Sequence, residues 1–336
     1  MPGAGLEVAR GALHLVTGSF VGVAGVVAEY FGAPTSLPLN IHREIGRVMI
    51  LVIGGRSKIG SAVLDHLGRR GASVRALARS SEPSAAFPLP IETVTGDLVD
   101  PASLEAAMQG VEQVFLLCGP TPDEVTLNRN AIDAAHASGV RLVVRSSILA
   151  ADPASTATFD RNHGESDAYL ARSGLAHVIL RPNYFAQNVP ESVIPTIDGD
   201  GRFYANLGDT RLSIVDTADV GAVAAVVLTN PGHDGKAYDV TGPEALSYDD
   251  VASKLSSRLG RRVEYVDVPD AAARSALTNA GLGDWLVDSL VSLFAQYRHS
   301  GTDGYAAQVS DTVQQLTGQP AHTLEDVLAT ALDSSP

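Results

Sequence analysis

The residues MILVIGGRSKIGSAV at positions 49–63 combine an apolar run, a glycine-rich turn and the start of a helical pattern. The run 49–53 predicts a buried strand, and the spacing of apolar residues over 58–70 predicts a helix with one buried face. A strand, a tight glycine turn and a helix in this order form the first half of a βαβ unit. Such a turn lets backbone N–H groups and a helix N-terminus approach a pyrophosphate. The stretch therefore predicts an α/β fold with a nucleotide site at its first turn.

Short apolar runs and helical patterns continue to alternate as far as Arg181. We predict further strands at 73–78, 91–95, 113–117, 141–145 and 177–180, and helices at 101–108, 123–138 and 160–172. This alternation is typical of a doubly wound parallel sheet that carries helices on both faces.

The pattern changes after Arg181, where Pro, Gly and Asn break the stretch 181–211 into loops. A helix beginning near Asp216 or Thr217 should return to the sheet. We predict helices near 248–259, 271–281, 285–297 and 324–332, and a short strand at 263–266. We therefore expect one dinucleotide-binding domain over 49–336, with a small, mostly helical substrate cap formed by about 184–212 and 242–336.

The first 48 residues stand apart from this pattern. Their apolar stretch 11–28 is diluted by polar residues and glycines, which makes it weak both as a membrane span and as a signal peptide. We expect residues 1–48 to be a loosely attached, disordered extension, or the result of an upstream start in place of Met49. Stable membrane insertion is not expected.

Composition narrows the function further. The chain has 336 residues, 45% of them apolar, which suits a globular protein with a sizeable core. With 24 basic and 38 acidic residues the net charge is −14, which repels nucleic acid. One cysteine, and no CxxC or HExxH pattern, offers neither an internal disulfide nor a metal site, so we expect a cytoplasmic protein without a metal.

The glycine turn supplies the first predicted cofactor residues, which are Gly54, Gly55, Arg56, Ser57, Lys58, Ile59 and Gly60. Ser57 stands where such loops usually carry a middle glycine. Its hydroxyl either hydrogen-bonds the phosphate or weakens binding, because a side chain restricts close approach of the ligand.

The end of the second strand favours NADPH over NADH. Sites for NAD usually place an acid there to accept hydrogen bonds from the ribose hydroxyls, whereas this strand ends ALARSS. Arg79 and Arg56 are predicted to bind a 2′-phosphate, with Ser80 as a hydroxyl donor. Asp97 and Leu98, after the third strand, are predicted to lie at the adenine edge.

Four stretches together resemble the NmrA-like branch of the atypical short-chain dehydrogenases/reductases. They are VIGGRSKIGSAV at 52–63, VRALAR at 74–79, AIDAAHASGVRLVVRSS at 131–147 and SGLAHVILRPNYFAQN at 173–188. The resemblance implies a Rossmann-like domain that binds NAD(P) and a small C-terminal substrate region. It also implies either a reductase of quinones, dyes, enones or related aromatic compounds, or a sensor of the nicotinamide redox state.

Ordinary members of that superfamily use a Tyr-x-x-x-Lys pair, in which the lysine lowers the pKa of the tyrosine so that it can donate a proton. None of the nine tyrosines has a lysine four residues on. His163, near the start of the predicted helix 160–172, is the best substitute, either as a proton donor or as a ligand of the nicotinamide ribose. The alternative is a solvated histidine at a helix start. Tyr184 is the second predicted catalytic residue, as a proton donor or as an aromatic wall.

Further cofactor contacts are predicted at the ends of the fourth, fifth and sixth strands. Ser146 and Ser147 are expected to orient a substrate carbonyl or the nicotinamide carboxamide, because ligands of open α/β sheets bind at the carboxyl edge. The resemblance implies that Asn183 lines the nicotinamide pocket. Cys118 and Gly119 should lie near the cofactor, Cys118 as a small apolar residue and not as a nucleophile.

We therefore predict an NADPH-dependent reductase that transfers hydride to a quinone, enone or carbonyl of a small aromatic substrate. The alternatives are a redox-sensing regulator without catalysis, or an isomerase or reductive cyclase. Neither a monomer nor a homodimer is excluded by the residues.

Overall fold

A parallel sheet forms the centre of the molecule. The computed structural model describes residues 48–79 and 91–333, so Ser80 and the extension 1–47 lie outside the described residues. Within these ranges the seven-stranded sheet has the order β3-β2-β1-β4-β5-β6-β8. Its strands are β1 (Met49–Ile53), β2 (Ser73–Ala78), β3 (Glu92–Thr95), β4 (Gln113–Leu116), β5 (Leu142–Ser146), β6 (Ala176–Pro182) and β8 (Lys236–Val240). The order reverses between β1 and β4, as in a Rossmann-like, doubly wound fold, which confirms the predicted fold class.

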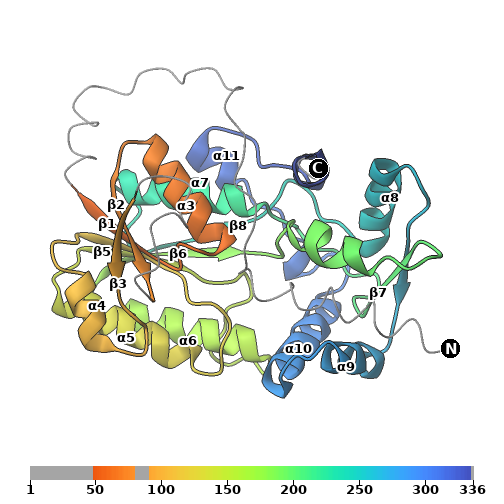
Figure 1. The fold of residues 1–336 in the computed structure, drawn as a ribbon, viewed down its shortest axis with the longest axis horizontal. Helices are drawn as coiled ribbons and strands as arrows, with labels where there is room; N and C mark the ends of the chain where they lie inside the picture. The colour runs from red at the N-terminus through yellow and green to blue at the C-terminus, as the bar shows by residue number, and fades with distance from the viewer. Residues whose placement is uncertain (1–47, 80–90, 334–336) are drawn as a thin grey trace.

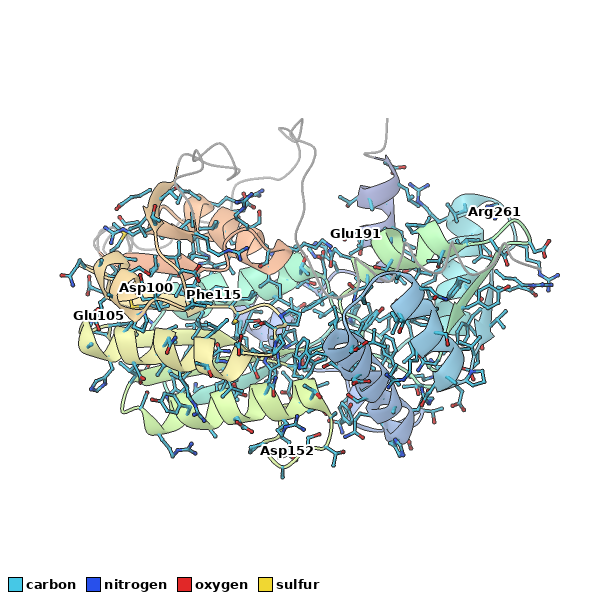
Figure 2. The ribbon with its side chains drawn as sticks, turned by 60° about the horizontal axis from the view of Figure 1, so that its bottom comes forward. Asp100, Glu105, Phe115, Asp152, Glu191 and Arg261 are labelled. Carbon is cyan, nitrogen blue, oxygen red and sulfur yellow. The ribbon has the colours of Figure 1, made fainter. Side chains whose placement is uncertain are left out.

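Two layers of helices cover the sheet (Figure 1). One face carries α3 (Lys58–Arg69), α7 (Thr217–Thr229) and α11 (Thr312–Thr317), and the other carries α4 (Pro101–Ala107), α5 (Glu124–Ala137) and α6 (Thr158–Arg172). Successive residues of a strand point to opposite faces, so Ile50 packs in the apolar core under α3 and α7, whereas Leu51 packs under the other helices. Phe115 is fully buried at the centre of this arrangement (Figure 2).

Close contact between α3 and α7 depends on a glycine. A Cβ on Gly221 of α7 would lie 2.5 Å from the Cβ of Ala62 on α3, which is too short for any side chain. The glycine therefore brings the two backbones together over β1, where the glycine turn begins.

A cap with its own apolar core follows the sheet. A small parallel sheet pairs β7 (Arg202–Ala205) with β9 (Glu264–Asp267). The surrounding elements are α8 (Tyr248–Leu259), α9 (Asp270–Asn279), α10 (Asp284–Ser300), α12 (Leu324–Asp333), the π-helix η2 (Val189–Val193), and the 3-10 helices η3 (Ile194–Thr196) and η4 (Tyr305–Ala307). Phe203, Val251 and Phe294 are buried together inside the cap.

Three elements differ from the sequence prediction. Strands β7 and β8 were not predicted: β8 is the mostly exposed edge strand of the large sheet and carries no apolar run. Helix α11 lies in the region predicted as cap, yet Val313 packs in the apolar core beneath α3 and α7. No helix within 48–79 and 91–333 is long and apolar enough to cross a membrane, and the apolar stretch 11–28 lies outside those ranges.

Candidate functional site

The glycine turn after β1 is shaped by contacts that exclude side chains. Gly54 has a φ of +82°, and a Cβ there would lie 2.7 Å from the carbonyl oxygen of Leu117. A Cβ on Gly60 would lie 2.1 Å from the carbonyl oxygen of Gly54. The turn therefore requires glycine at both positions for its tight course into α3, and a tight glycine turn ahead of a helix N-terminus fits a dinucleotide pyrophosphate.

Ser57 caps α3. Its hydroxyl accepts a hydrogen bond from the backbone N–H of Gly60 at 3.0 Å and donates one to the carbonyl oxygen of Gly54 at 2.8 Å. The proton of this hydroxyl is therefore already bound inside the loop. Ser57 thus stabilises the turn from a position where such loops commonly carry a glycine.

Lys58, the first residue of α3, forms an ion pair with Glu191 of η2. Both side chains are about one-third exposed, and Figure 2 shows Glu191 on the side of the cap that faces the nucleotide domain. The pair connects the predicted phosphate loop to the cap, a contact that the sequence pattern did not reveal.

Arg79, directly after β2, and the turn after β3 lie at the same edge of the sheet, because the two strands are parallel neighbours. Arg79 is exposed directly after β2. The backbone N–H of Asp97 donates to the hydroxyl of Ser103 at 2.9 Å, and the carbonyl oxygen of Leu98 accepts from the side chain of Asn130 at 2.9 Å. Asp97 and Leu98 thus form a fixed turn that leads into α4.

A buried cluster of polar side chains lies at the ends of β5 and β6, beneath α5 and α6. Ser147 donates to Oδ2 of Asp167 at 2.8 Å, and Arg145 pairs with the other oxygen of this carboxylate. Glu124 and Asn128 of α5 complete the cluster. Arg145, Asp167 and Glu124 were not among the predicted site residues. The signal for Arg145 was its charge within the apolar strand RLVVRSS, because a buried arginine requires carboxylate partners.

His163 lies inside this cluster. Its Nδ1 is 3.1 Å from a terminal guanidinium nitrogen (Nη2) of Arg145, and its Nε2 is 3.3 Å from Oε1 of Glu124. The side chain is 14% exposed, so it is not the solvated histidine of the alternative interpretation. Burial, together with the neighbouring Arg145, lowers the pKa of His163 well below its ordinary value.

Glu124 is a buried acid whose pKa is shifted from its ordinary value. Burial raises the pKa of its carboxyl group to about 7, an effect that Arg145 partly opposes. Cys118 lies close enough to be influenced by Glu124, and burial raises the pKa of its thiol to about 12. A thiol with this pKa stays protonated near neutral pH, as expected for a residue that is not a nucleophile.

Tyr184 belongs to the core of the cap. Its hydroxyl lies 2.8 Å from the hydroxyl of Tyr248, and burial raises the pKa of Tyr184 to about 12. The neighbouring Asn183 donates its amide to the hydroxyl of Ser213 at 2.8 Å and to the carbonyl oxygen of Ala306 at 2.7 Å. Ser146 is buried at the end of β5, whereas Gly119 is exposed after β4.

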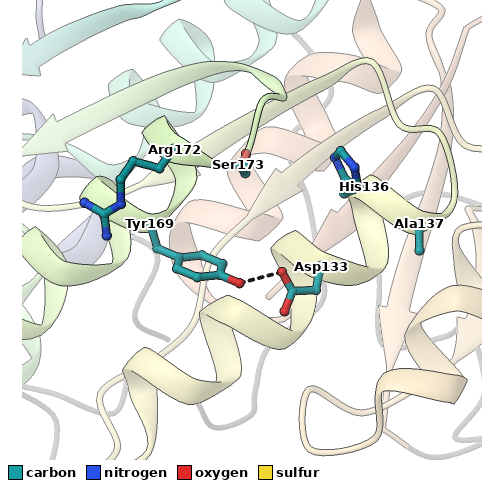
Figure 3. A pocket seen from close by; sticks show the side chains of 6 residues that line it. All are labelled: Asp133, His136, Ala137, Tyr169, Arg172 and Ser173. Atoms are coloured by element: carbon teal, nitrogen blue, oxygen red, sulfur yellow. Dashed lines mark hydrogen bonds between the residues drawn. The ribbon is translucent and has the colours of Figure 1, made fainter.

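A surface depression of about 410 Å³ lies elsewhere, between the last turns of α5 and α6 (Figure 3). Tyr169 donates to Asp133 across it at 2.7 Å, and Arg172 and His136 contribute to its wall. Because helices that follow parallel strands end at the amino edge of the sheet, this depression lies at the opposite end from the glycine turn.

Comparison with known proteins agrees with this geometry. A family model described as NAD(P)H-binding matches residues 54–231, which include the glycine turn, Ser147 and His163. The chain belongs to this NAD(P)H-binding family. The NAD(P)H azoreductase of Xenophilus azovorans is 37% identical over 279 residues, which cover 83% of this chain and 96% of that protein. Quinone oxidoreductase 2 of Escherichia coli is 30% identical and covers 83% of this chain and 96% of its own length.

Solved structures of the family share the fold. The NADPH complex of an NADPH-dependent quinone oxidoreductase from Escherichia coli has a TM-score of 0.77 at 29% identity and covers 84% of this chain and 100% of its own. NmrA, a negative transcriptional regulator solved in complex with NAD, has a TM-score of 0.66 at 18% identity and covers 84% and 94%. The family match confirms the NAD(P)H-binding part of the resemblance, and the NmrA structure shares the fold of this chain.

Proposed function

We propose that the protein is an NADPH-dependent reductase that transfers a hydride to a quinone, an enone or another conjugated group of a small aromatic substrate. The observation that carries the proposal is the placement of the glycine turn at the same sheet edge as Ser147 and His163. In this fold, that edge is where a dinucleotide and its substrate meet. The relatives named azoreductase and quinone oxidoreductase support the substrate class.

The chain's own residues would hold the cofactor in two regions. The turn 54–60 and the N-terminus of α3 would bind the pyrophosphate, and Arg79 would bind the 2′-phosphate that distinguishes NADPH from NADH. Ser147 and His163 would contact the nicotinamide end. When bound, NADPH supplies the hydride, while the apolar core of the cap shields the acceptor from water.

Water is the proton source that the geometry favours. His163 stays neutral because its pKa is lowered, and both of its nitrogens face partners within the buried cluster. Tyr184 has a pKa of about 12 and shares its hydroxyl with Tyr248, which suits an aromatic wall. We therefore assign His163 and Tyr184 to shaping the site around the nicotinamide and the acceptor.

The test is the consumption of NADPH, with NADH alongside, across a panel of quinones, enones, azo dyes and aromatic aldehydes. We expect turnover with NADPH well above that with NADH. Arg79→Gln should reduce this preference by about 10- to 100-fold, the value of one charge-assisted contact. Arg261→Gln, at the far end of the cap (Figure 2), is the matched control and should leave the preference unchanged. An unchanged preference in Arg79→Gln would refute its role.

A redox-sensing regulator is the second candidate. The observation that favours it is that Nδ1 of His163 lies 3.1 Å from Arg145 and the hydroxyl of Tyr184 lies 2.8 Å from that of Tyr248, so both candidate proton donors already contact other side chains. This candidate predicts silence across the substrate panel while the chain still binds the cofactor, with clearly different affinities for its oxidised and reduced forms. Equal affinities for the two forms would exclude it.

A further inference from the structure

Arg145 is the centre of the buried cluster, although it is the least expected residue in the strand that carries it. It is 1% exposed, and its guanidinium faces four partners on two helices. It pairs with Oδ1 of Asp167, its Nε lies 3.4 Å from Oδ1 of Asn128, and a terminal nitrogen (Nη2) lies 3.1 Å from Nδ1 of His163. The same terminal nitrogen is 3.7 Å from Oε1 of Glu124. One cation thus contacts His163 directly and reaches Ser147 through the carboxylate of Asp167.

The guanidinium determines which nitrogen of His163 carries the proton. A guanidinium has N–H donors and no acceptor, so Nδ1 of His163 can meet it only with a lone pair. The ring proton must then be on Nε2, which lies 3.3 Å from Oε1 of Glu124. An imidazolium would direct an N–H at the guanidinium, and the two cations would repel each other. Arg145 therefore holds His163 in one neutral tautomer and one orientation.

The same residue determines what Ser147 can bind. Arg145 and Ser147 engage the two oxygens of Asp167, and Ser147 gives its only hydroxyl proton to Oδ2 at 2.8 Å. The hydroxyl can then offer a ligand only lone pairs. A carbonyl oxygen, which also only accepts, does not fit Ser147. A ligand atom at this position must carry N–H or O–H.

We propose that Arg145 is a positioning residue that holds Ser147 as a hydrogen-bond acceptor and His163 as a neutral ring for the nicotinamide end of the cofactor. The proposal rests on the proposed function, since it takes the cofactor to be a nicotinamide nucleotide. The ligand chemistry that fits Ser147 is a donor, found in the carboxamide N–H₂ and in the ribose hydroxyls. The charged and titratable groups facing His163 are Arg145 of β5 and Glu124 of α5. Behind Arg145 lies Asp167 of the same helix as His163, whose Oδ2 is also 3.9 Å from Nε of Arg181 on β6.

The first experiment measures the tautomer directly. Nitrogen-15 NMR of the full chain labelled at histidine, without cofactor, should show His163 neutral and protonated at Nε2 between about pH 6 and pH 8. In Glu124→Gln, which keeps an oxygen near Nε2, the tautomer should be unchanged. A cationic His163 at neutral pH, or a proton on Nδ1, would overturn the proposal whether or not the chain has a substrate.

The second experiment measures binding of NADPH. Arg145→Lys keeps the charge but cannot bridge Asp167 and His163 at once, so the Kd should rise by about tenfold and the proton of His163 should no longer be held at Nε2 alone. Arg141→Lys, at an exposed arginine directly before the same strand, is the matched control and should change neither. If Arg145→Lys does not fold, Ser147→Ala gives the same test, because it removes the acceptor without a buried charge and should also cost about tenfold.

An NADPH analogue in which an acetyl group replaces the carboxamide shows whether Ser147 accepts its hydrogen bond from the carboxamide or from a ribose hydroxyl. If Ser147 binds the carboxamide, Ser147→Ala weakens NADPH and leaves the analogue unaffected. If it binds a ribose hydroxyl, both ligands are weakened equally. Unchanged NADPH affinity in Ser147→Ala would refute the proposal. Failure of the wild-type chain to bind NADPH would refute the proposed function itself and is distinct from that result.

Discussion

Replacing Asp160 with asparagine should stabilise the protein at neutral and alkaline pH. Asp160 lies in the first turn of α6, is 2% exposed, and its Oδ1 has no hydrogen-bond partner among the described residues. Burial raises the pKa of this carboxyl group from 3.8 to about 6, and Ser155, whose hydroxyl is 3.4 Å from Oδ2, opposes the effect. The ionised form is therefore poorly accommodated in the fold.

The magnitude follows from linkage between protonation and folding. The native pKa is above the unfolded value, so the stability that the protonated group contributes is fully present below about pH 3.8 and is lost as pH rises through about 6. Each pKa unit corresponds to about 1.4 kcal/mol, so the loss approaches about 3 kcal/mol above pH 7. Asparagine has no charge to bury. The free energy of unfolding of Asp160→Asn should thus exceed that of the wild type by up to about 3 kcal/mol at pH 8.

The assay is urea unfolding of both proteins at about pH 4 and at pH 8, with Asp209→Asn, an exposed aspartate, as the control. The gap between Asp160→Asn and the wild type should widen with pH, whereas the control should show no such trend. A gap of the same size at both pH values would refute the reasoning, because it would show that the carboxyl group carries no buried charge in the native state.

Three further results are expected. His322, whose Nδ1 lies 2.8 Å from Asp219, has its pKa raised to about 9 mainly by that hydrogen bond, so its contribution to stability is fully present below about pH 6.5 and is lost as pH rises through about 9. Because the side chain is half exposed, His322→Gln should cost less than about 1 kcal/mol at pH 6, and thermal unfolding should show the cost vanish near pH 10. Gly60→Ala should abolish NADPH binding, measured by titration calorimetry, whereas Gly199→Ala in the cap, with open space around its Cβ position, should bind normally. Tyr184→Phe should keep turnover within about threefold while losing about 1 kcal/mol of stability from the broken hydroxyl contact with Tyr248, and a large loss of turnover would identify Tyr184 as the proton donor.

The strands and helices of the nucleotide domain were predictable because their signals are local. The predicted strand 49–53 and the predicted helix 58–70 agree closely with the observed bounds of β1 and α3. The predicted helix 248–259 has the same bounds as α8. Strand β8 was not predictable in this way. It is an edge strand, and only its pairing with β6 makes it part of the sheet.

The residues of the candidate site also fall into those that local sequence predicts and those that only the fold brings together. The sequence by itself determined the glycine turn predicted to bind a phosphate and the arginine, in place of an acid, directly after β2, since both are properties of a few consecutive residues. It also predicted Ser147 at the carboxyl edge of the sheet and His163 near the start of a helix.

Only the tertiary structure decided their chemistry. Glu124, Arg145 and Asp167 come from three separate elements, and it is their contact in a buried space that keeps His163 neutral and takes the proton of Ser147. A pKa depends on the charges and the solvent around a group, and a hydroxyl's role depends on where its one proton is already bound. Neither is recorded along the chain, because both are set by residues that folding brings together from distant positions.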